Sequence, residues 1–447
     1  MENRPEKPTP TRKRKHSGTN IYHRLLTLLF SVFVLVIAYV VYKAVNQGIG
    51  LPVSSVGQPA PNDQIYVQEH DRLSQPSEEQ STQPSTTERT EPTEPSVTEP
   101  TEPDEPIEPQ ELAQSYLADM SLEDKIWQMM IVSSDRLLAV DGSQYPVGGV
   151  YYAPENLTDA QALADDMFAV QATAKTPVMF GVMHEGGSRS PLTDLDLAEI
   201  VGTMRSYGDT GDTDEMYTIS LHMGEQIRAA GFHFNLAPVA DTYTGLNGWI
   251  PAAVYDMENR TFGTLEDISS GLLQSMVSQS VKGMQAGGTI TCLKHFPNLG
   301  SSGPTDEGDT SWRGQQTFEA EDFKPFEAGI EAGAQMVMVS NMNAPYLTNG
   351  FNIPCCRAKE VVTDILRNRL GFEGVILTDD QSTQTNAANI VATVQAGCDM
   401  IYLPADAQAA VNAIMEAVQN GTLSETQIDE SVYRILLMKC ENGIITE

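Results

Sequence analysis

Two kinds of hydrophobic segment divide the chain. The first is a single uncharged run near the N-terminus, residues 25–42. The second is a series of short apolar runs that begins at residue 129, and most of these runs are followed by a stretch with helical spacing. Residues 45–110, between the two, are mostly polar. The pattern therefore predicts a membrane-spanning segment, a polar linker and one folded domain.

Eight short apolar runs in the C-terminal part predict β-strands. They alternate with helix-like stretches such as residues 214–231, 321–334 and 358–371, and this alternation favours parallel βαβ units. Eight such units in residues 111–447 predict an α/β fold, a (β/α)8 barrel of the TIM type. A doubly wound open sheet is the main alternative, although the first unit lacks the glycine-rich fingerprint of dinucleotide-binding sheets. The runs are residues 129–132, 147–152, 177–183, 232–240, 288–296, 334–340, 374–380 and 399–404.

The N-terminal region predicts a single-pass membrane anchor. Residues 1–21 form a basic tail, and residues 22–44 contain the uncharged run, which is long enough to cross the hydrocarbon core. The positive-inside rule places the tail in the cytoplasm and everything after Lys43 outside the cell membrane. A cleaved signal peptide is the alternative, but the run is longer than a usual signal-peptide core and no clear cleavage motif follows it.

Residues 45–110 predict a disordered stalk. The segment is rich in Thr, Glu and Pro, with repeated Thr-Glu-Pro units, and it has too little apolar surface to offset the entropy lost on folding. Proline and mutual repulsion between carboxylates keep such a chain extended. We expect the stalk to hold the C-terminal domain away from the bilayer.

Composition excludes some classes of function. The net charge of −33 argues against nucleic-acid binding, which requires clustered Lys and Arg side chains. No cysteine spacing indicates a metal site, and nothing in the sequence calls for a cofactor. We interpret the five cysteines as small buried apolar residues; they are Cys292, Cys355, Cys356, Cys398 and Cys440.

Polar side chains follow five of the eight predicted strands. The clearest case is the seventh run, where Val375, Ile376 and Leu377 are followed, after Thr378, by Asp379 and Asp380. Catalytic groups of parallel barrels lie at the C-terminal ends of the strands, so these side chains predict one functional rim. Alternatively, the two aspartates only solvate the strand end or cap the next helix. The rim residues are His184, Glu185, Asp241, Lys294, His295, Asn341 and Asp379.

Several motifs in one order resemble glycoside hydrolase family 3, in its single-domain β-N-acetylhexosaminidase-type form. The resemblance covers about residues 113–447. KHFP, followed at the expected distance by GFEGVILTDD, is the most specific part. The matching stretches are residues 121–129, 235–242, 259–263, 294–310, 371–380, 396–404 and 428–439.

The resemblance implies roles for individual residues. Asp379 matches the nucleophile, which forms a covalent glycosyl-enzyme in retaining hydrolysis. Lys294, His295 and Arg260 match residues that bind the hydroxyl groups of the sugar. Structural roles are the alternative for each: Lys294 could pair with Asp379, His295 could support a neighbour, and Arg260 could brace a loop. The other rim residues are further candidates for substrate binding.

Two departures from the family pattern affect the site. Met183 stands where the family has a sugar-gripping Asp, in MHEGGSRSP, and the downstream arginine is replaced or shifted to Arg189. The neighbouring His184 is polar and could substitute in part for the missing Asp.

The second departure concerns the general acid/base. Hexosaminidase-type members carry a His in the loop after KHFP, but residues 298–312 contain none. Glu307 falls near that position, flanked by Asp306 and Asp309, and carboxylic acids are the common proton donors of retaining glycosidases. Like charges close together raise a carboxyl pKa, as an acid catalyst requires. A solvated acidic loop is the alternative.

Two functions remain open from the sequence. One is a membrane-anchored, extracytoplasmic retaining glycosidase that acts on N-acetylglucosamine-containing glycans of the cell wall, without a metal or cofactor. The other is a catalytically degenerate family member that binds glycans or acts as a scaffold. Met183 and the loop without His favour the second, whereas the intact TDD, KHF and RTFG stretches favour the first.

Overall fold

A computed structural model of the chain describes residues 107–447, except 138–146, 244–256, 302 and 306–307. The predicted tail, membrane anchor and stalk, up to residue 106, lie outside the described residues. No helix within the described part is long and apolar enough to cross a membrane. The first described helix, α2 (Pro109–Asp119), begins two residues before the predicted start of the domain.

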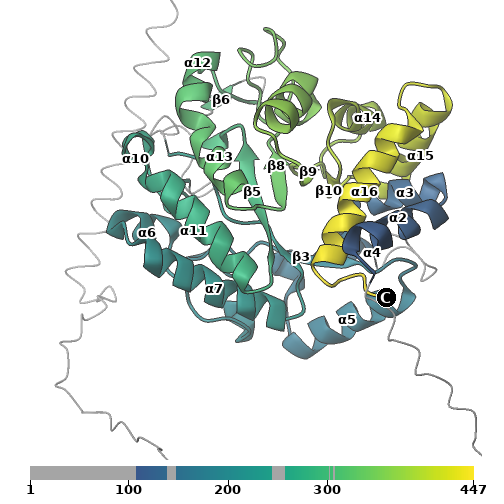
Figure 1. Cartoon of the computed structure of the whole chain (residues 1–447), viewed down its shortest axis with the longest axis horizontal. Helices are drawn as coiled ribbons and strands as arrows, with labels where there is room; N and C mark the ends of the chain where they lie inside the picture. The colour runs from purple at the N-terminus through teal and green to yellow at the C-terminus, as the bar shows by residue number, and fades with distance from the viewer. Residues whose placement is uncertain (1–106, 138–146, 244–256, 302, 306–307) are drawn as a thin grey trace, which may run out of the picture. The chain divides into compact units, whose positions relative to one another are not determined.

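Eight parallel strands form a nearly closed barrel, as predicted (Figure 1). Their order in the sheet is β10-β1-β2-β3-β4-β5-β8-β9. A further parallel bridge joins Leu377, in β9, to Met400, directly before β10, so the two ends of this order meet. This bridge distinguishes the barrel from the doubly wound open sheet that was the alternative. The strands are β1 (Met130–Ser133), β2 (Gly149–Tyr151), β3 (Met179–Val182), β4 (Phe234–Asn235), β5 (Ile290–Phe296), β8 (Met336–Val339), β9 (Val375–Thr378) and β10 (Ile401–Tyr402).

The barrel strands are buried on both faces. In β9, Val375, Ile376 and Leu377 have no exposed surface, and β3 and β8 are buried throughout. A strand that contacts the barrel interior on one face and helices on the other has no reason to alternate apolar and polar residues. This double burial explains why each strand could be found in the sequence as a continuous apolar run.

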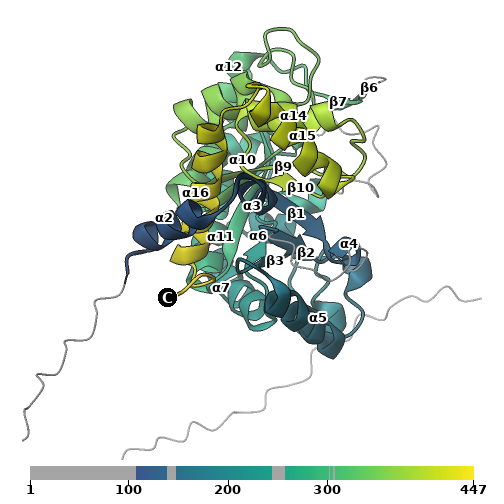
Figure 2. The same cartoon turned by 90° about the vertical axis from the view of Figure 1, so that its right-hand side faces the viewer.

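Helices pack around the strands and connect them (Figures 1 and 2). Among the longer ones, α7 packs against α11, and the C-terminal helix α16 packs against α2 and α3. Helix α3 begins after Ser121, where Ser121 and Asp124 form a reciprocal capping box. The helices are α3 (Leu122–Gln128), α4 (Ser134–Leu137), η1 (Pro154–Asn156), α5 (Ala160–Thr173), η2 (Thr193–Leu195), α6 (Met204–Thr210), α7 (Thr213–Ala229), α9 (Met257–Arg260), α10 (Leu265–Ser270), α11 (Leu272–Ala286), η3 (Leu299–Ser301), α12 (Gln315–Thr317), η4 (Phe318–Asp322), α13 (Lys324–Glu331), η5 (Cys355–Arg357), η6 (Glu360–Arg369), α14 (Ala387–Ala396), α15 (Ala407–Gln419) and α16 (Glu425–Glu441).

A short hairpin follows β5 and was not predicted. It consists of β6 (Gly303–Thr305) and β7 (Gly308–Thr310), which pair antiparallel (Figure 2). The segment has no alternation of apolar and polar residues that would indicate strands. Its pairing is made by backbone groups, which leave no signature in side-chain polarity.

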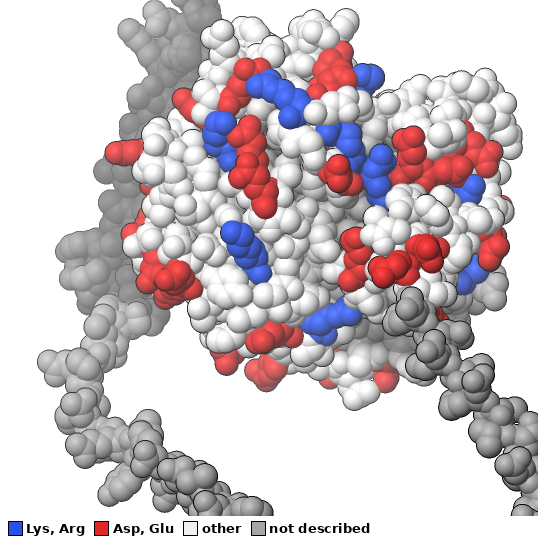
Figure 3. All heavy atoms as spheres, viewed as in Figure 1, with Lys and Arg blue, Asp and Glu red and all other residues white. Residues whose placement is uncertain are grey.

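The cysteines and the surface charges agree with the sequence. All five cysteines are buried, as predicted, and the structure shows them with free thiols. On the face shown in Figure 3, acidic and basic side chains are interspersed. The basic side chains on this face of the domain therefore form no continuous basic surface.

Lys439 is a buried charge at the end of the barrel where the strands begin. Its Nζ donates hydrogen bonds of 2.7 Å to Oε1 of Gln128 and to the carbonyl of Pro177, which precede β1 and β3. Burial lowers the pKa of Lys439 to about 7. The side chain therefore holds α16 to the barrel while giving up its proton near neutral pH.

Replacing Lys439 by Met should flatten the pH dependence of the free energy of unfolding above pH 7. The ordinary lysine pKa of 10.5 lies above the folded value of about 7, so between them the unfolded chain binds more protons and stability rises with pH. The wild-type curve should climb relative to that of Lys439→Met by up to ~1.4 kcal/mol per pH unit.

Urea denaturation across the range from neutral to about pH 9.5 measures this difference. Lys282→Met is the matched control, because Lys282 is exposed on α11, and its curve should follow that of the wild type. Parallel curves for the wild type and Lys439→Met would contradict the assignment.

Candidate functional site

The predicted rim residues lie at the end of the barrel where the parallel strands finish. Lys294 and His295 belong to β5 itself, and Arg260 is the last residue of α9, between β4 and β5. The parallel arrangement brings residues that are far apart in the sequence to the same end. Those that directly follow a strand or its extension are His184 and Glu185 after β3, Asp241 after β4, Asn341 after β8 and Asp379 after β9.

A buried ion-pair triad lies at the centre of this end. Nε and Nη2 of Arg260 pair with the two carboxylate oxygens of Glu185 at 2.7 and 2.8 Å, and Nζ of Lys294 lies 2.5 Å from Glu185 Oε1. Exposed fractions are 3% for Glu185, 7% for Arg260 and 1% for Lys294. The bidentate geometry satisfies the guanidinium and the carboxylate together, which partly offsets the cost of removing three charges from water.

The charges of the triad determine the protonation of its members. Burial by itself would raise the pKa of Glu185, but Lys294 and Arg260 hold it far below its ordinary value. Burial lowers the pKa of Lys294, against the opposing effect of Glu185. For Arg260, burial acts to lower the pKa, whereas Glu185, with smaller effects of Asp241 and Asp379, raises it overall. One carboxylate thus faces two cations, and the triad carries a net positive charge close to Asp379.

A tight turn places Glu185 in the triad. The backbone N–H of Glu185 donates to the carbonyl of Arg189, and the N–H of Arg189 donates to the carbonyl of Gly186. Gly186 and Gly187 have φ values of 99° and 55°, which favour glycine, and a Cβ at Gly186 would lie 2.6 Å from the carbonyl oxygen of Gly202. Two consecutive glycines are therefore needed for the turn, and the backbone of Arg189 closes it.

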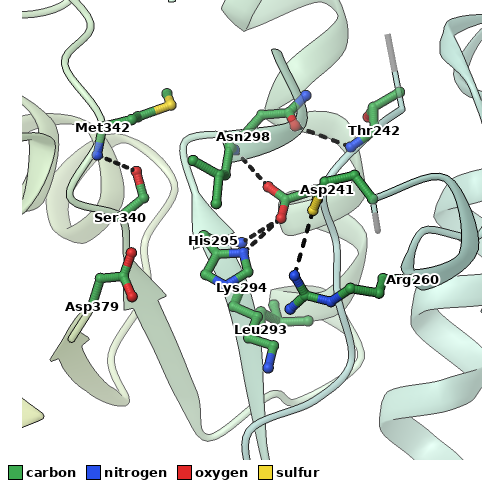
Figure 4. A network of polar contacts seen from close by, with 12 residues as sticks. Asp241, Thr242, Arg260, Leu293, Lys294, His295, Asn298, Ser340, Met342 and Asp379 are labelled. Atoms are coloured by element: carbon green, nitrogen blue, oxygen red, sulfur yellow. Dashed lines mark hydrogen bonds and ion pairs between the residues drawn. The ribbon is translucent and has the colours of Figure 1, made fainter. Parts of the chain in front are cut away.

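The carboxylate of Asp241 holds both the ring and the backbone of His295. Its Oδ2 lies 2.7 Å from Nδ1 of His295 and accepts the His295 backbone N–H at 3.1 Å, while its Oδ1 accepts the N–H of Leu299 at 2.7 Å (Figure 4). Asp241 has no exposed surface. The sequence suggested Asp241 as a substrate-binding residue; the structure places it as a buried group that orients the imidazole and the start of the following loop.

Asp379 sits at the end of β9 in a set of backbone donors. Its Oδ2 accepts the N–H of Asn341 at 3.2 Å, and its Oδ1 accepts the N–H of Asp380 at 2.8 Å. Asp379 is half-buried, and Figure 4 shows it at the same end of the barrel as Lys294, His295 and Arg260. A carboxylate whose two oxygens both accept backbone hydrogen bonds is held in one orientation, as a group that must face a developing positive charge requires.

Asn341 and Gln381 hold the segment around Asp379 in place. Nδ2 of Asn341 donates to the carbonyl of Asp380 at 2.7 Å. Nε2 of Gln381 donates at 2.8 Å to both Oδ1 of Asn341 and the carbonyl of Asp379. Gln381 was not predicted, because an uncharged residue two positions after a catalytic candidate carries no signal of its own.

The side chain of His184 is buried. It has no exposed surface, and neither ring nitrogen has a hydrogen-bond partner in the part of the chain that the structure describes. Burial lowers the pKa of His184 to about 4, so the ring is neutral at physiological pH. Met183, at the position of the expected Asp, is half-buried and packs against the core. The suggested substitution of His184 for that Asp would therefore require the buried ring to reorient.

The candidate acid/base residues are only partly described. Asp306 and Glu307 lie outside the described residues. Asp309 is in β7 and is half-buried, and its carbonyl accepts the N–H of Asn343 at 2.8 Å. The geometric relation between the acid/base candidates and Asp379 stays a prediction.

Asp322 anchors both ends of the loop that carries these candidates. Its Oδ1 accepts Nδ2 of Asn298 at 2.5 Å, and its Oδ2 pairs with Nε of Arg313 at 2.7 Å. Asn298 has a φ of 149°, where glycine is favoured, and its Oδ1 also accepts the N–H of Thr242 at 3.0 Å. Asn298 directly follows KHFP in the sequence, and its role as an anchor of the loop was not predicted.

Comparison with known proteins gives a consistent result. Residues 121–438 match the family described as the glycosyl hydrolase family 3 N-terminal domain. A beta-N-acetylglucosaminidase/beta-glucosidase of Cellulomonas fimi is 27% identical over 353 residues, which are 73% of this chain and 59% of that protein. A beta-hexosaminidase of Stenotrophomonas maltophilia is 29% identical over 275 residues, 58% of this chain and 76% of that protein.

A solved structure supports the same relation. A glycoside hydrolase family 3 beta-N-acetylglucosaminidase from Paenibacillus superposes with a TM-score of 0.64 and 25% identity, over 73% of this chain and 63% of that one. The chain thus spans less than two thirds of the Cellulomonas and Paenibacillus proteins.

Replacing Glu185 by Gln should strongly destabilise the domain. The substitution removes the carboxylate that pairs with the buried side chains of Arg260 and Lys294, a change that typically costs ~3–5 kcal/mol of the free energy of unfolding. Asp364→Asn is the matched control, because it breaks the exposed pair of Asp364 with Lys359 and should cost at most about 1 kcal/mol. Urea denaturation at neutral pH measures both, and similar losses for the two variants would argue against the triad.

Proposed function

The chain belongs to glycoside hydrolase family 3, and from this membership we propose that it is a retaining hydrolase of the β-N-acetylglucosaminidase type. One observation carries the proposal: Asp379 lies at the same end of the barrel as the Glu185–Arg260–Lys294 triad and His295. The names of the Cellulomonas and Stenotrophomonas relatives support the substrate class.

In the proposed mechanism Asp379 attacks the anomeric carbon of the terminal sugar. As the glycosidic bond breaks, an acid donates a proton to the leaving oxygen, and a covalent glycosyl-enzyme forms. The same residue, now a base, removes a proton from water, which attacks the anomeric carbon and releases Asp379. The backbone N–H groups of Asn341 and Asp380 fix both oxygens of the nucleophile before the reaction.

The triad and His295 line the base of the proposed sugar site. Arg260 and His295 each retain a small exposed fraction, 7%, which suits contact with the hydroxyl groups of a single ring. Lys294 is more deeply buried and acts through the same network. Because Glu185 fixes both cations, their donors are oriented before the sugar binds, which lowers the entropic cost of binding.

Glu307 is the proposed acid/base, with Asp306 and Asp309 as its neighbours in sequence. A carboxylic acid suits this step, because a Glu or Asp is the usual proton donor of retaining glycosidases. On either side of these candidates in the sequence, Asn298 and Arg313 are both bound to Asp322.

We propose cell-wall glycan that contains N-acetylglucosamine as the substrate. In this proposal residues 22–44 anchor the chain in the cell membrane, and the stalk of residues 45–110 carries the barrel outward. The stalk would let a membrane-bound enzyme reach glycan at some distance from the bilayer.

A glycan-binding protein without catalysis is the second candidate. Two observations favour it: Met183 occupies the place of a sugar-gripping Asp, and residues 298–312 lack the family's His. Both changes leave Asp379 and the triad in place. The second candidate therefore predicts sugar affinity without turnover.

A mechanism-based fluorosugar should form a covalent adduct on Asp379. Intact-mass analysis followed by peptide mapping of the labelled protein locates it. Asp379→Asn should abolish labelling and lower kcat/KM on an aryl β-N-acetylglucosaminide by on the order of 10⁴-fold or more. Asp364→Asn, on the exposed surface, is the control and should label like the wild type.

Two results would contradict the proposal. An adduct on a different residue would remove Asp379 as the nucleophile. No turnover on β-N-acetylglucosaminides or β-glucosides, combined with measurable glycan affinity, would favour the second candidate.

Glu307→Gln should slow substrates with poor leaving groups far more than activated aryl glycosides. An activated leaving group departs without a proton, so loss of the acid matters little in that step. Steady-state kinetics on an alkyl and a nitrophenyl glycoside measure the contrast, with Asp306→Asn and Asp309→Asn as matched variants. Equal slowing of both substrates by Glu307→Gln would remove the assignment.

A further inference from the structure

Two aromatic rings stand exposed next to each other near the loop after β5. Trp312 follows β7, and Tyr346 lies in the segment after β8; their ring centroids are 6.5 Å apart at an angle of 80°. The exposed fractions are 63% for Trp312 and 57% for Tyr346. Phe351 and Ile353, in the same segment as Tyr346, are also exposed. Four of the seven large hydrophobic residues exposed in the described part of the chain thus belong to these two segments.

The exposure is not that of an unfolded loop. Met342, Ala344 and Leu347 are buried on the other side of the segment that carries Tyr346. The N–H of Gly350 donates to the carbonyl of Pro345 at 2.7 Å, and that of Cys355 donates to the carbonyl of Met342 at 2.8 Å. The segment is therefore folded against the core on one side and presents aromatic rings on the other.

Backbone hydrogen bonds connect these rings to the proposed nucleophile. The N–H of Ser311 donates to the carbonyl of Asn343 at 2.9 Å, which joins the Trp312 segment to the Tyr346 segment. Asn341, two residues earlier, donates its N–H to Asp379. Tyr346 is five residues beyond Asn341, so its Cα lies within about 18 Å of the Asn341 Cα. An oligosaccharide of a few rings spans such a distance.

The surface chemistry selects among possible ligands. A second copy of this chain, with a net charge of −33, would be repelled, and so would an anionic lipid surface. An uncharged glycan is not repelled. Pyranose rings have apolar faces that stack on Trp and Tyr, while their hydroxyl groups remain in water, and such a ligand leaves the rings exposed when it is absent.

We propose that Trp312 and Tyr346 form a stacking site for further sugar rings of the glycan chain that is cleaved at Asp379. The inference rests on the proposed function and adds to it a preference for oligosaccharides over disaccharides. Figure 2 shows β7, which Trp312 follows, beside β6.

Chain-length dependence of the kinetics tests the site. The ratio of kcat/KM for the β-1,4-linked N-acetylglucosamine tetrasaccharide to that for the disaccharide should fall about five-fold in Trp312→Ala and in Tyr346→Ala. Phe168→Ala is the matched control, because Phe168 is exposed on α5, outside both segments, and its ratio should equal that of the wild type. An unchanged ratio in both test variants would overturn the inference.

Tryptophan fluorescence gives a readout that does not depend on turnover. Of the three tryptophans, Trp127 is buried, Trp312 is exposed and Trp249 lies outside the described residues. The tetrasaccharide should shift the emission of the full-length Asp379→Asn protein, and the contribution of Trp312 to this shift should be lost when Trp312 is replaced by Phe, with Trp127 and Trp249 unchanged in both proteins. If disaccharide is cleaved but the emission does not respond, the stacking site is wrong and the hydrolase stands. If nothing is cleaved but the Trp312-dependent shift persists, the stacking site stands and the hydrolase fails.

Sedimentation velocity on the same proteins tests the competing occupant. A wild-type dimer that dissociates in Trp312→Ala would show that the rings contact a second copy, and it would overturn the inference. A monomer in both proteins supports it.

Discussion

The buried carboxylate of Glu185 is the interaction on which the candidate site depends. It joins Arg260, at the end of α9, to Lys294, in β5, and it reaches them from the turn after β3. Without it, two cationic side chains that are almost fully buried would lose their shared carboxylate, which is far more costly than the loss of a surface ion pair. Because one carboxylate pairs with two cations, the triad keeps a net positive charge close to Asp379. Stability of this end of the barrel and the electrostatics of the proposed reaction therefore have one origin.

The barrel supplies the geometry that the ion pairs exploit. Parallel strands end together, so the side chains that follow β3, β4, β8 and β9 meet without long connections. Buried polar side chains then orient the site residues and the segments that carry them. Asp241 orients His295, Gln381 and Asn341 hold the backbone around Asp379, and Asp322 ties the loop after β5 to the barrel.

How much could be read from the sequence follows from the same physics. The strands were predictable because a strand that is buried on both faces has a continuous run of apolar residues in the sequence, as in residues 374–380. The rim was predictable because polar residues directly follow those runs. The partner of Lys294 was not, since Glu185 and Asp379 are both carboxylates at strand ends and only the three-dimensional arrangement selects Glu185. The burial of Asp241 and His184 was equally hidden, because direction of a side chain at a strand end is set by neighbours far away in the sequence. The aromatic pair of Trp312 and Tyr346 depends on contact between two loops and has no local signature.

A crystal structure of the protein with N-acetylglucosamine bound would test the proposed site most directly. We expect one sugar ring at the C-terminal end of the barrel, with its anomeric carbon facing a carboxylate oxygen of Asp379 and its hydroxyl groups contacting Arg260 and His295. The Glu185 ion pairs should be unchanged by the sugar. A sugar bound elsewhere on the domain, with this end of the barrel left to solvent, would contradict the central claim.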